Sequence, residues 1–228
     1  MIRAILLDAA GTLIRPAEPV AEVYARYFAG AGWPVEASRL SDAFRSAFEG
    51  ADDPSYRDYP DGDSAERAWW RNVVVATARD VGAELTGDAL ERCFTGLFKH
   101  YASGDAWAVF PEVRPQLERW RASGLRLAVV SNFDRRLHCI LEELNLAPFF
   151  DVIVCSADAR ARKPDPAIFR HALGRLDVSP AEAVHIGDCP VADGGGAAGL
   201  EIAGFVLKRP EITLLDADRW LAEEFCSK

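Results

Sequence analysis

The chain has 228 residues, of which 50% are hydrophobic, enough for one substantial core and a second, smaller module. Its formal net charge of -9 disfavours nucleic acids and anionic membrane surfaces as partners, because both repel an acidic protein. The sequence has no run of about 18 apolar residues that could span a bilayer. Asp8 also interrupts the N-terminal apolar run, so we expect a cytoplasmic protein without a signal peptide.

The N-terminal stretch predicts a buried strand that ends on a carboxylate. Residues 3–7 are mostly apolar, Asp8 follows them, and the small residues up to Gly11 indicate a chain reversal. We therefore expect Asp8 at the carboxyl end of a strand, which is where ligands bind in open α/β sheets.

A helical segment follows, in which apolar residues recur three and four positions apart. Ser64 is the expected N-cap of the third helix, because it follows a break rich in Asp and Gly. The expected helices cover Val20–Ala31, Ser38–Glu49, Ala65–Val81 and Asp88–Tyr101.

Beyond Gly104, strands and helices alternate, which is typical of a parallel sheet with crossover helices. The sequence thus predicts an α/β fold: a doubly wound, Rossmann-like parallel sheet in residues 1–14 and 104–228, and a helical cap, residues 15–103, inserted after the first strand. The expected strands are Leu125–Val130, Val152–Val154, Ala183–Ile186 and Ile202–Leu207, and the expected helices are Pro111–Ser123, Arg135–Leu144, Pro166–Leu176, Ala192–Ala198 and Ala217–Phe225.

Two loops of this second half place polar groups where a predicted strand ends. Ser131 and Asn132 offer a hydroxyl and an amide, which suit phosphate or carboxylate oxygens. Lys163 lies in a loop stiffened by two prolines and offers a point charge to an anion and to the Asp8 carboxylate.

Another loop carries two carboxylates, Asp188 and Asp193, around a turn after an apolar strand. The glycines at 194–196 would each weaken a helix by about 1 kcal/mol relative to alanine, so we expect some group to approach that backbone closely. Together with Asp8, the two carboxylates would repel one another unless a cation lay among them. Mg²⁺ fits, because it prefers oxygen ligands and keeps waters that a phosphate can displace.

In their order and spacing, these loops resemble those of the haloacid dehalogenase superfamily, and the position of the helical insert resembles its C1 cap class. The segment 125–137 and the pair Trp69-Trp70 are similar to the branch called haloacid dehalogenase-like hydrolase domain-containing proteins.

The resemblance implies a role for each loop residue. Asp8 becomes the nucleophile that forms a covalent intermediate, and Lys163 becomes the charge stabiliser. Ser131 and Asn132 become binders of a small phosphorylated substrate. The implied Mg²⁺ ligands are Asp8, the backbone carbonyl of Ala10, Asp188 and Asp193.

The first loop departs from the pattern of phosphatases in this superfamily, which read Asp-x-Asp there and use the second Asp as general acid and base. This chain has Ala10 at that position. The backbone carbonyl survives the change, but a positioned acid or base is worth roughly 10²–10⁴ in rate, or about 3–5 kcal/mol of barrier. We therefore expect weak or narrow phosphatase activity, suited to good leaving groups such as acyl or aryl phosphates.

Three alternatives remain open. The first loop, Asp8–Leu13, is also similar to that of 2-haloacid dehalogenases, whose halide leaves without a proton. A phosphonatase has a similar first loop but needs a lysine early in the cap. The only lysine in the cap of this chain is Lys99, near its far end. A protein that keeps the site but binds or senses phosphate without turnover also fits Ala10. The oligomeric state is open.

Other polar residues are expected to serve the fold. His185, on an apolar strand, is expected to be a packed core histidine, and residues 134–136 are expected to form a solvated helix start. The cysteines are odd in number and lack paired spacing, so we expect reduced, mostly buried thiols. They are Cys93, Cys139, Cys155, Cys189 and Cys226.

Overall fold

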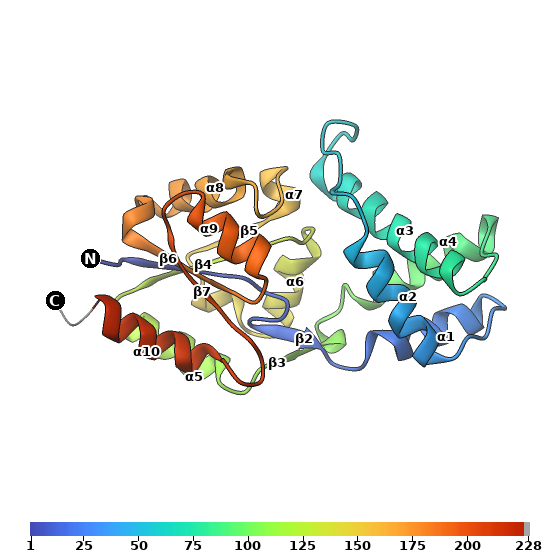
Figure 1. The fold of residues 1–228 in the computed structure, drawn as a ribbon, viewed down its shortest axis with the longest axis horizontal. Helices are drawn as coiled ribbons and strands as arrows, with labels where there is room; N and C mark the ends of the chain where they lie inside the picture. The colour runs from blue at the N-terminus through green and yellow to red at the C-terminus, as the bar shows by residue number, and fades with distance from the viewer. Residues whose placement is uncertain (226–228) are drawn as a thin grey trace. The chain divides into compact units, whose positions relative to one another are not determined.

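The computed structural model describes residues 1–225, and the chain divides into two compact units. One unit comprises Met1–Arg15 and Ala108–Lys228, and the other comprises Pro16–Trp107. The first is built from a sheet and flanking helices, whereas the second is helical (Figure 1).

Among the described residues, five parallel strands form the main sheet in the order β5-β4-β1-β6-β7. The chain moves from the central strand β1 outward to β4 and β5, and then returns to the other side of β1 for β6 and β7. The predicted doubly wound parallel sheet is therefore confirmed, and β1 lies at the switch point, where such sheets bind ligands. The strands are β1 (Ala4–Leu7), β4 (Arg126–Ser131), β5 (Val152–Cys155), β6 (Ala183–Gly187) and β7 (Ala203–Val206).

Helices cover both faces of this sheet, as Figure 1 shows, with α8 and α9 on one face and α5 and α10 on the other. The strands are apolar on both faces because both are covered, and every residue of β1 is buried. Leu6, Val130 and Phe169 belong to one buried cluster between the sheet and α8. The helices of this unit are α5 (Val113–Ala122), α6 (Arg136–Glu143), α7 (Ser156–Ala159), α8 (Pro166–Leu176), a π-helical turn η4 (Pro190–Gly195), α9 (Gly196–Ala198) and α10 (Leu214–Phe225), with short 3₁₀ turns η2 (Ala147–Phe149) and η3 (Pro180–Glu182).

The helical unit packs its apolar helix faces against one another. Tyr24, Phe28 and Phe94 are buried in one cluster of this unit. The third helix starts earlier than predicted: Asp61, not Ser64, is the N-cap, and its carboxylate accepts a hydrogen bond from the Ser64 backbone N–H. The helices are α1 (Val20–Gly30), α2 (Ala37–Glu49), α3 (Gly62–Asp80) and α4 (Gly87–His100), followed by the 3₁₀ turn η1 (Gly104–Ala106).

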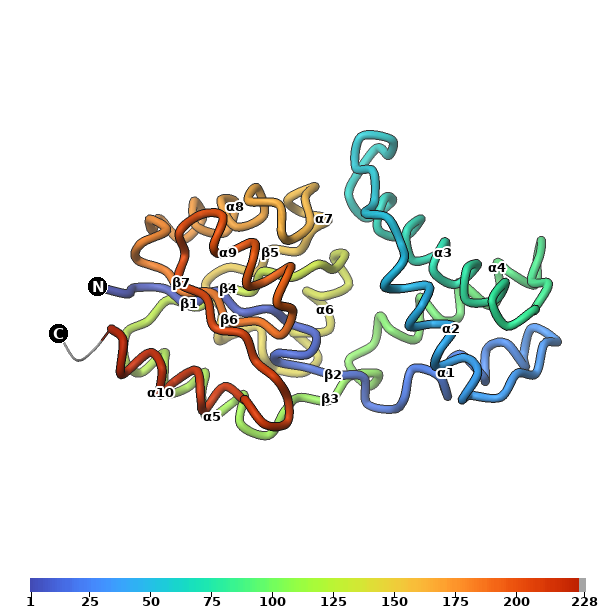
Figure 2. The backbone as a smooth tube through the Cα atoms, in the orientation of Figure 1, coloured from blue at the N-terminus to red at the C-terminus, as the bar shows by residue number. Residues whose placement is uncertain are grey.

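Two short strands that the sequence did not predict connect the units. Figure 2 shows the chain leaving the sheet after β1, passing through the helical unit and returning toward the sheet. On this path β2 (Ile14–Pro16) pairs with β3 (Trp107–Val109). Strands of three residues are too short for an alternating pattern to be visible in the sequence. Within residues 1–225, no helix is both long enough and apolar enough to cross a membrane.

The described cysteines are free thiols, as expected. Cys93 and Cys155 are buried, but Cys139 and Cys189 are exposed, so the expectation of mostly buried thiols holds for only half of them. Cys226 lies outside the described residues.

Candidate active site

The register of the sheet brings three of the predicted loops to one edge. Leu7 of β1 lies opposite Val129 of β4 and Ile186 of β6. Asp8 therefore leaves the sheet beside the ends of both neighbouring strands, and its backbone N–H donates to the Ile186 carbonyl at 2.9 Å.

A buried lysine joins two of the carboxylates. Lys163 Nζ donates to Asp8 Oδ1 at 2.7 Å and to Asp193 Oδ1 at 2.6 Å. All three residues are buried, with exposed fractions of 4% for Lys163, 6% for Asp8 and 2% for Asp193. Burial alone would lower the pKa of Lys163, but the two carboxylates outweigh it and raise that pKa, so the ammonium keeps its charge.

Asp193 is held by hydrogen bonds on both carboxylate oxygens. Besides Lys163, its Oδ1 lies 2.8 Å from His185 Nε2, and its Oδ2 accepts from the Cys189 backbone N–H at 2.9 Å. Burial acts to raise the pKa of Asp193, yet the bonds from His185 and Lys163 hold that pKa below its usual range. The side chain is therefore a fixed anion whose oxygens are already engaged by the protein.

His185 is packed in the core, as expected, but it also contacts the site. It is 1% exposed, its ring lies edge-on to Phe169 at 5.0 Å, and burial lowers its pKa. The neutral ring therefore donates its Nε2 proton to Asp193, and the tautomer follows from that bond. The sequence offered no sign of this positioning role, because an apolar strand with one histidine is also typical of simple packing.

Asp188 is the exposed member of the carboxylate group. Loss of water around its carboxyl, together with the negative charges of Asp8 and Asp193, raises the pKa of Asp188 to about 7. Its side chain passes against Gly11, where an added Cβ would lie 2.2 Å from Asp188 Oδ2. Gly11 also has φ of +86°, so the reversal after Asp8 requires glycine both for its backbone and for the space.

The glycine run that follows Asp193 has the expected close approach at Gly196. A Cβ on Gly196 would lie 2.7 Å from the Phe169 ring and 3.1 Å from Pro164 Cα. The group that approaches this backbone at Gly196 is therefore the protein's own core, so the run is not by itself a sign of a ligand.

Asn132 pairs with the main chain of the lysine loop. Its Nδ2 donates to the Lys163 carbonyl at 3.0 Å, and its Oδ1 accepts from the Lys163 N–H at 2.7 Å. This amide therefore fixes the backbone from which Lys163 reaches Asp8. Ser131, the last residue of β4, is 2% exposed.

Arg209 anchors the loop after Asp8, and nothing in the sequence indicated it. Its Nε and Nη2 donate to the carbonyls of Gly11 and Thr12 at 3.0 and 2.6 Å. Its Nη1 donates to Glu112 Oε1 at 2.6 Å. These partners lie about 100 or more positions from Arg209 in the chain, so no local pattern could reveal them.

The segment after Asn132 corrects a further expectation. Asp134 is 2% exposed and forms hydrogen bonds of 2.7 Å through each of its oxygens to Arg136, whose side chain is 13% exposed. This pair is therefore buried rather than solvated, whereas the side chain of Arg135 is 56% exposed.

The oxygens of the three aspartates form a possible cation site. One carboxylate oxygen from each of Asp8, Asp188 and Asp193 lies within 4.8 Å of the others. Lys163 supplies one positive charge against these three carboxylates, and an all-oxygen donor set suits a hard ion such as Mg²⁺. Ala10 is half-buried in the same loop and carries only a methyl group, which cannot transfer a proton.

Comparison with known proteins gives a consistent set of likenesses. A family model described as haloacid dehalogenase-like hydrolase matches residues 2–200. The haloacid dehalogenase-like hydrolase domain-containing protein 3 of Bos taurus is 36% identical over 211 residues, covering 92% of this chain and 83% of that protein.

Two solved structures share the fold. A HAD phosphatase from Thermococcus onnurineus has a TM-score of 0.67 at 24% identity, covering 96% of this chain and 98% of its own. A 2-haloacid dehalogenase from Pseudomonas syringae pv. Tomato DC3000 has a TM-score of 0.61 at 28% identity, covering 91% and 86%.

Proposed function

Because the chain belongs to the haloacid dehalogenase-like hydrolases, we propose that it hydrolyses a small phosphorylated molecule through a covalent intermediate on Asp8. The observation that carries this proposal is the buried Lys163 ammonium, which lies 2.7 Å from Asp8 Oδ1 at the tip of the central strand. The ammonium holds one oxygen of the carboxylate and leaves the other for attack.

In the first step, the free oxygen of Asp8 attacks phosphorus, and the bond from phosphorus to the leaving oxygen breaks. Lys163 offsets the negative charge that accumulates between the carboxylate and the phosphoryl oxygens. In the second step, water attacks phosphorus, the bond from phosphorus to the Asp8 oxygen breaks, and a proton of the water passes to solvent, which frees phosphate and restores the Asp8 carboxylate. We assign Ser131 the role of binding the substrate's phosphoryl oxygens. Asn132 assists by fixing the Lys163 backbone through two hydrogen bonds.

Mg²⁺ fits the donor set, and we assign its ligands to Asp8, Asp188 and the backbone carbonyl of Ala10. Asp193 takes a supporting role, since its oxygens already accept hydrogen bonds from Lys163, His185 and Cys189. When bound, the ion supplies positive charge that offsets the phosphate oxygens. The excess of negative charge over Lys163 supports this assignment.

Ala10 sets the range of substrates. Without an acid at that position the leaving oxygen departs unprotonated, so esters of acidic alcohols and acyl phosphates react faster than alkyl phosphates. Water also lacks a base beside the aspartyl phosphate, so the second step is slow. We place this activity in the cytoplasm, because the unpaired cysteine pattern suits a reducing compartment, and we assign the helical unit the role of the family's cap domain.

A 2-haloacid dehalogenase is the second candidate, and Ala10 is the observation that favours it, since halide needs no proton to leave. Against it, the charges of Asp188 and Asp193 would repel the carboxylate of a haloacid, with Lys163 alone to offset them. The third candidate function is phosphate binding without turnover.

One assay separates these candidates. We expect phosphate release from p-nitrophenyl phosphate in Mg²⁺, loss of it in excess chelator, and loss of it in Asp8→Asn at any Mg²⁺ concentration. Halide release from 2-chloropropionate in chelator would instead identify a dehalogenase. Phosphate binding without product in either assay would identify a binding protein.

A further inference from the structure

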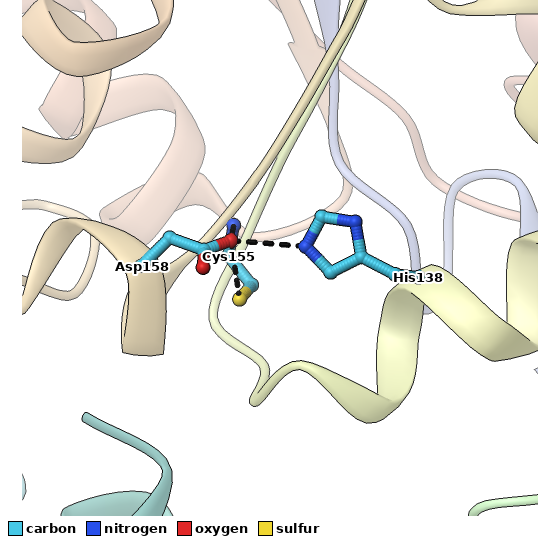
Figure 3. Close-up of side chains that lie close together, drawn as sticks. All are labelled: His138, Cys155 and Asp158. Atoms are coloured by element: carbon cyan, nitrogen blue, oxygen red, sulfur yellow. Dashed lines mark hydrogen bonds and ion pairs between the residues drawn. The ribbon is translucent and has the colours of Figure 1, made fainter. Parts of the chain in front are cut away.

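Three side chains that the proposed hydrolysis does not use lie together beside the edge strand β5. Figure 3 shows the Asp158 carboxylate between the Cys155 thiol and the His138 ring. Asp158 Oδ2 lies 3.0 Å from Cys155 Sγ and 3.0 Å from His138 Nε2. Cys155 ends β5, Asp158 lies in α7 and His138 lies in α6.

The three donor atoms have the spacing of ligands around one ion. One atom from each of His138, Cys155 and Asp158 lies within 4.8 Å of the others. Zn²⁺ bonds of about 2.0–2.3 Å place the ligands of a tetrahedral site roughly 3.3–3.8 Å apart. Opening the two hydrogen-bonded contacts by about half an ångström would therefore admit the ion.

The donor types select a different ion from the carboxylate site. A sulfur, an imidazole nitrogen and one carboxylate oxygen favour Zn²⁺ and similar borderline ions, whereas three carboxylates favour Mg²⁺. We propose that His138, Cys155 and Asp158 form a second, independent metal site that binds Zn²⁺ with water as the fourth ligand.

Ion binding replaces the hydrogen bonds that the three side chains make with one another. The Cys155 thiol loses its proton to solvent as the sulfur–metal bond forms. His138 Nε2, which donates its proton to Asp158 in the ion-free cluster, binds through its lone pair once the ring proton has moved to Nδ1 by exchange with solvent. Asp158 Oδ2 exchanges its hydrogen bonds from His138 and the Cys155 thiol for a metal bond and keeps the longer one, of 3.4 Å, from the Cys155 backbone N–H. Its Oδ1 stays on Arg135 Nε at 2.7 Å. A hydrogen-bonded second oxygen of this kind is the usual way a ligating carboxylate is oriented.

The ion can reach the cluster although Cys155 itself is buried. The side chains of His138 and Asp158 are 35% and 17% exposed, so the open side of the cluster faces water through them. The thiolate and carboxylate together carry two negative charges, of which Arg135 offsets one. The remaining negative charge favours binding of a divalent cation.

The site also has a structural link to the substrate loop. Cys155 pairs in register with Ser131, and the next residue, Ser156, donates its Oγ proton to the Phe133 carbonyl at 3.0 Å. A bound ion would tie α6 to β5 and α7 beside this loop, and so stabilise the core unit without touching Asp8.

Cobalt is the probe that reports a cysteine ligand directly. The purified full-length protein is stripped with chelator, placed in excess Mg²⁺ to saturate the carboxylate site, and titrated with Co²⁺. We expect a near-ultraviolet thiolate-to-cobalt absorption band that saturates at one ion per chain and disappears when Zn²⁺ is added. Absence of a saturable band would overturn the proposal, whatever the hydrolytic assays show.

Variants assign the band to this cluster. We expect Cys155→Ser to abolish the absorption band. We expect His138→Gln to weaken Co²⁺ binding by at least tenfold, and this substitution spares the core because the His138 side chain is partly exposed. Cys139→Ser is the matched control, because it removes an exposed thiol from the same helix α6 and should leave the band unchanged. A band that survives both ligand variants, or that Cys139→Ser removes, would contradict the assignment.

Discussion

Replacing Asp188 with asparagine is expected to stabilise the metal-free protein at neutral and alkaline pH. Partial burial of its carboxyl and the charges of Asp8 and Asp193 raise the pKa of Asp188 from 3.8 to about 7. The folded chain therefore holds this proton more tightly than the unfolded chain does. As pH rises between these two pKa values, the unfolded chain loses the proton more readily than the folded chain does, so Asp188 lowers the free energy of unfolding. Asparagine has no such proton to lose, so the variant avoids this decrease.

The size of the effect follows from the same pKa values. The change from 3.8 to about 7 corresponds to at most about 4 kcal/mol. Because Asp188 is exposed, water screens much of the repulsion, and about 1–2 kcal/mol should remain. The variant should thus match the wild type in acid and exceed its free energy of unfolding by this amount above pH 7.

Urea unfolding in chelator, repeated across this pH range, measures the difference. Asp80→Asn, an exposed carboxylate of the helical unit, serves as the control and should show no such pH-dependent gain. Added Mg²⁺ should stabilise the wild type more than Asp188→Asn, since the variant lacks one proposed ligand. If the variant is less stable than the wild type in alkaline chelator, or if the difference does not vary with pH, repulsion among the three carboxylates does not destabilise the metal-free protein.

Three further substitutions probe the same edge of the sheet. Gly11→Ala places a methyl group 2.2 Å from Asp188 Oδ2 at φ of +86°. We expect the free energy of unfolding in urea to fall by more than about 1 kcal/mol and Mg²⁺ binding, measured by calorimetry, to weaken. Wild-type values for both would contradict this expectation. Lys163→Met leaves Asp8 without its buried cation, so we expect about 3–5 kcal/mol of destabilisation and a fall in kcat of about 10²–10³; near-normal turnover would exclude Lys163 from the chemistry. Ala10→Asp should raise turnover of p-nitrophenyl phosphate by about 10²-fold or more, and an unchanged rate would mean that proton transfer is not what limits the native protein.

The sheet and the loops at its edge were predictable from the sequence because each strand is a short apolar run that ends on a polar residue. Asp8 directly follows β1, and Lys163 and Asp193 lie in the segments that follow β5 and β6. The structure brings these three side chains into hydrogen-bonding contact. The family resemblance added the role expected of each loop residue.

Contacts between distant parts of the chain were not predictable. His185 looks like any core residue until the fold places it 2.8 Å from Asp193, and Arg209 has no local signal for its bonds to the loop after Asp8. The glycine run predicted that some group approaches this backbone, but only the fold shows that at Gly196 the group is the Phe169 ring of the core.

The cysteine and histidine cluster was missed for the same reason. His138 lies 17 residues from Cys155, outside any compact metal-binding spacing, and only the pairing of β4 with β5 and the position of α6 bring them together. In the sequence, Cys155 and Asp158 are separated by two residues, which by itself is an ordinary pattern.

Intact-mass measurement after rapid acid quench tests whether Asp8 carries the phosphoryl group during turnover. With p-nitrophenyl phosphate and Mg²⁺ present, we expect a chain heavier by one phosphoryl group, located on the peptide that contains Asp8, because Ala10 leaves the second step slow. Phosphate release with no mass gain at any quench time, or a phosphoryl group on another residue, would exclude Asp8 as the nucleophile.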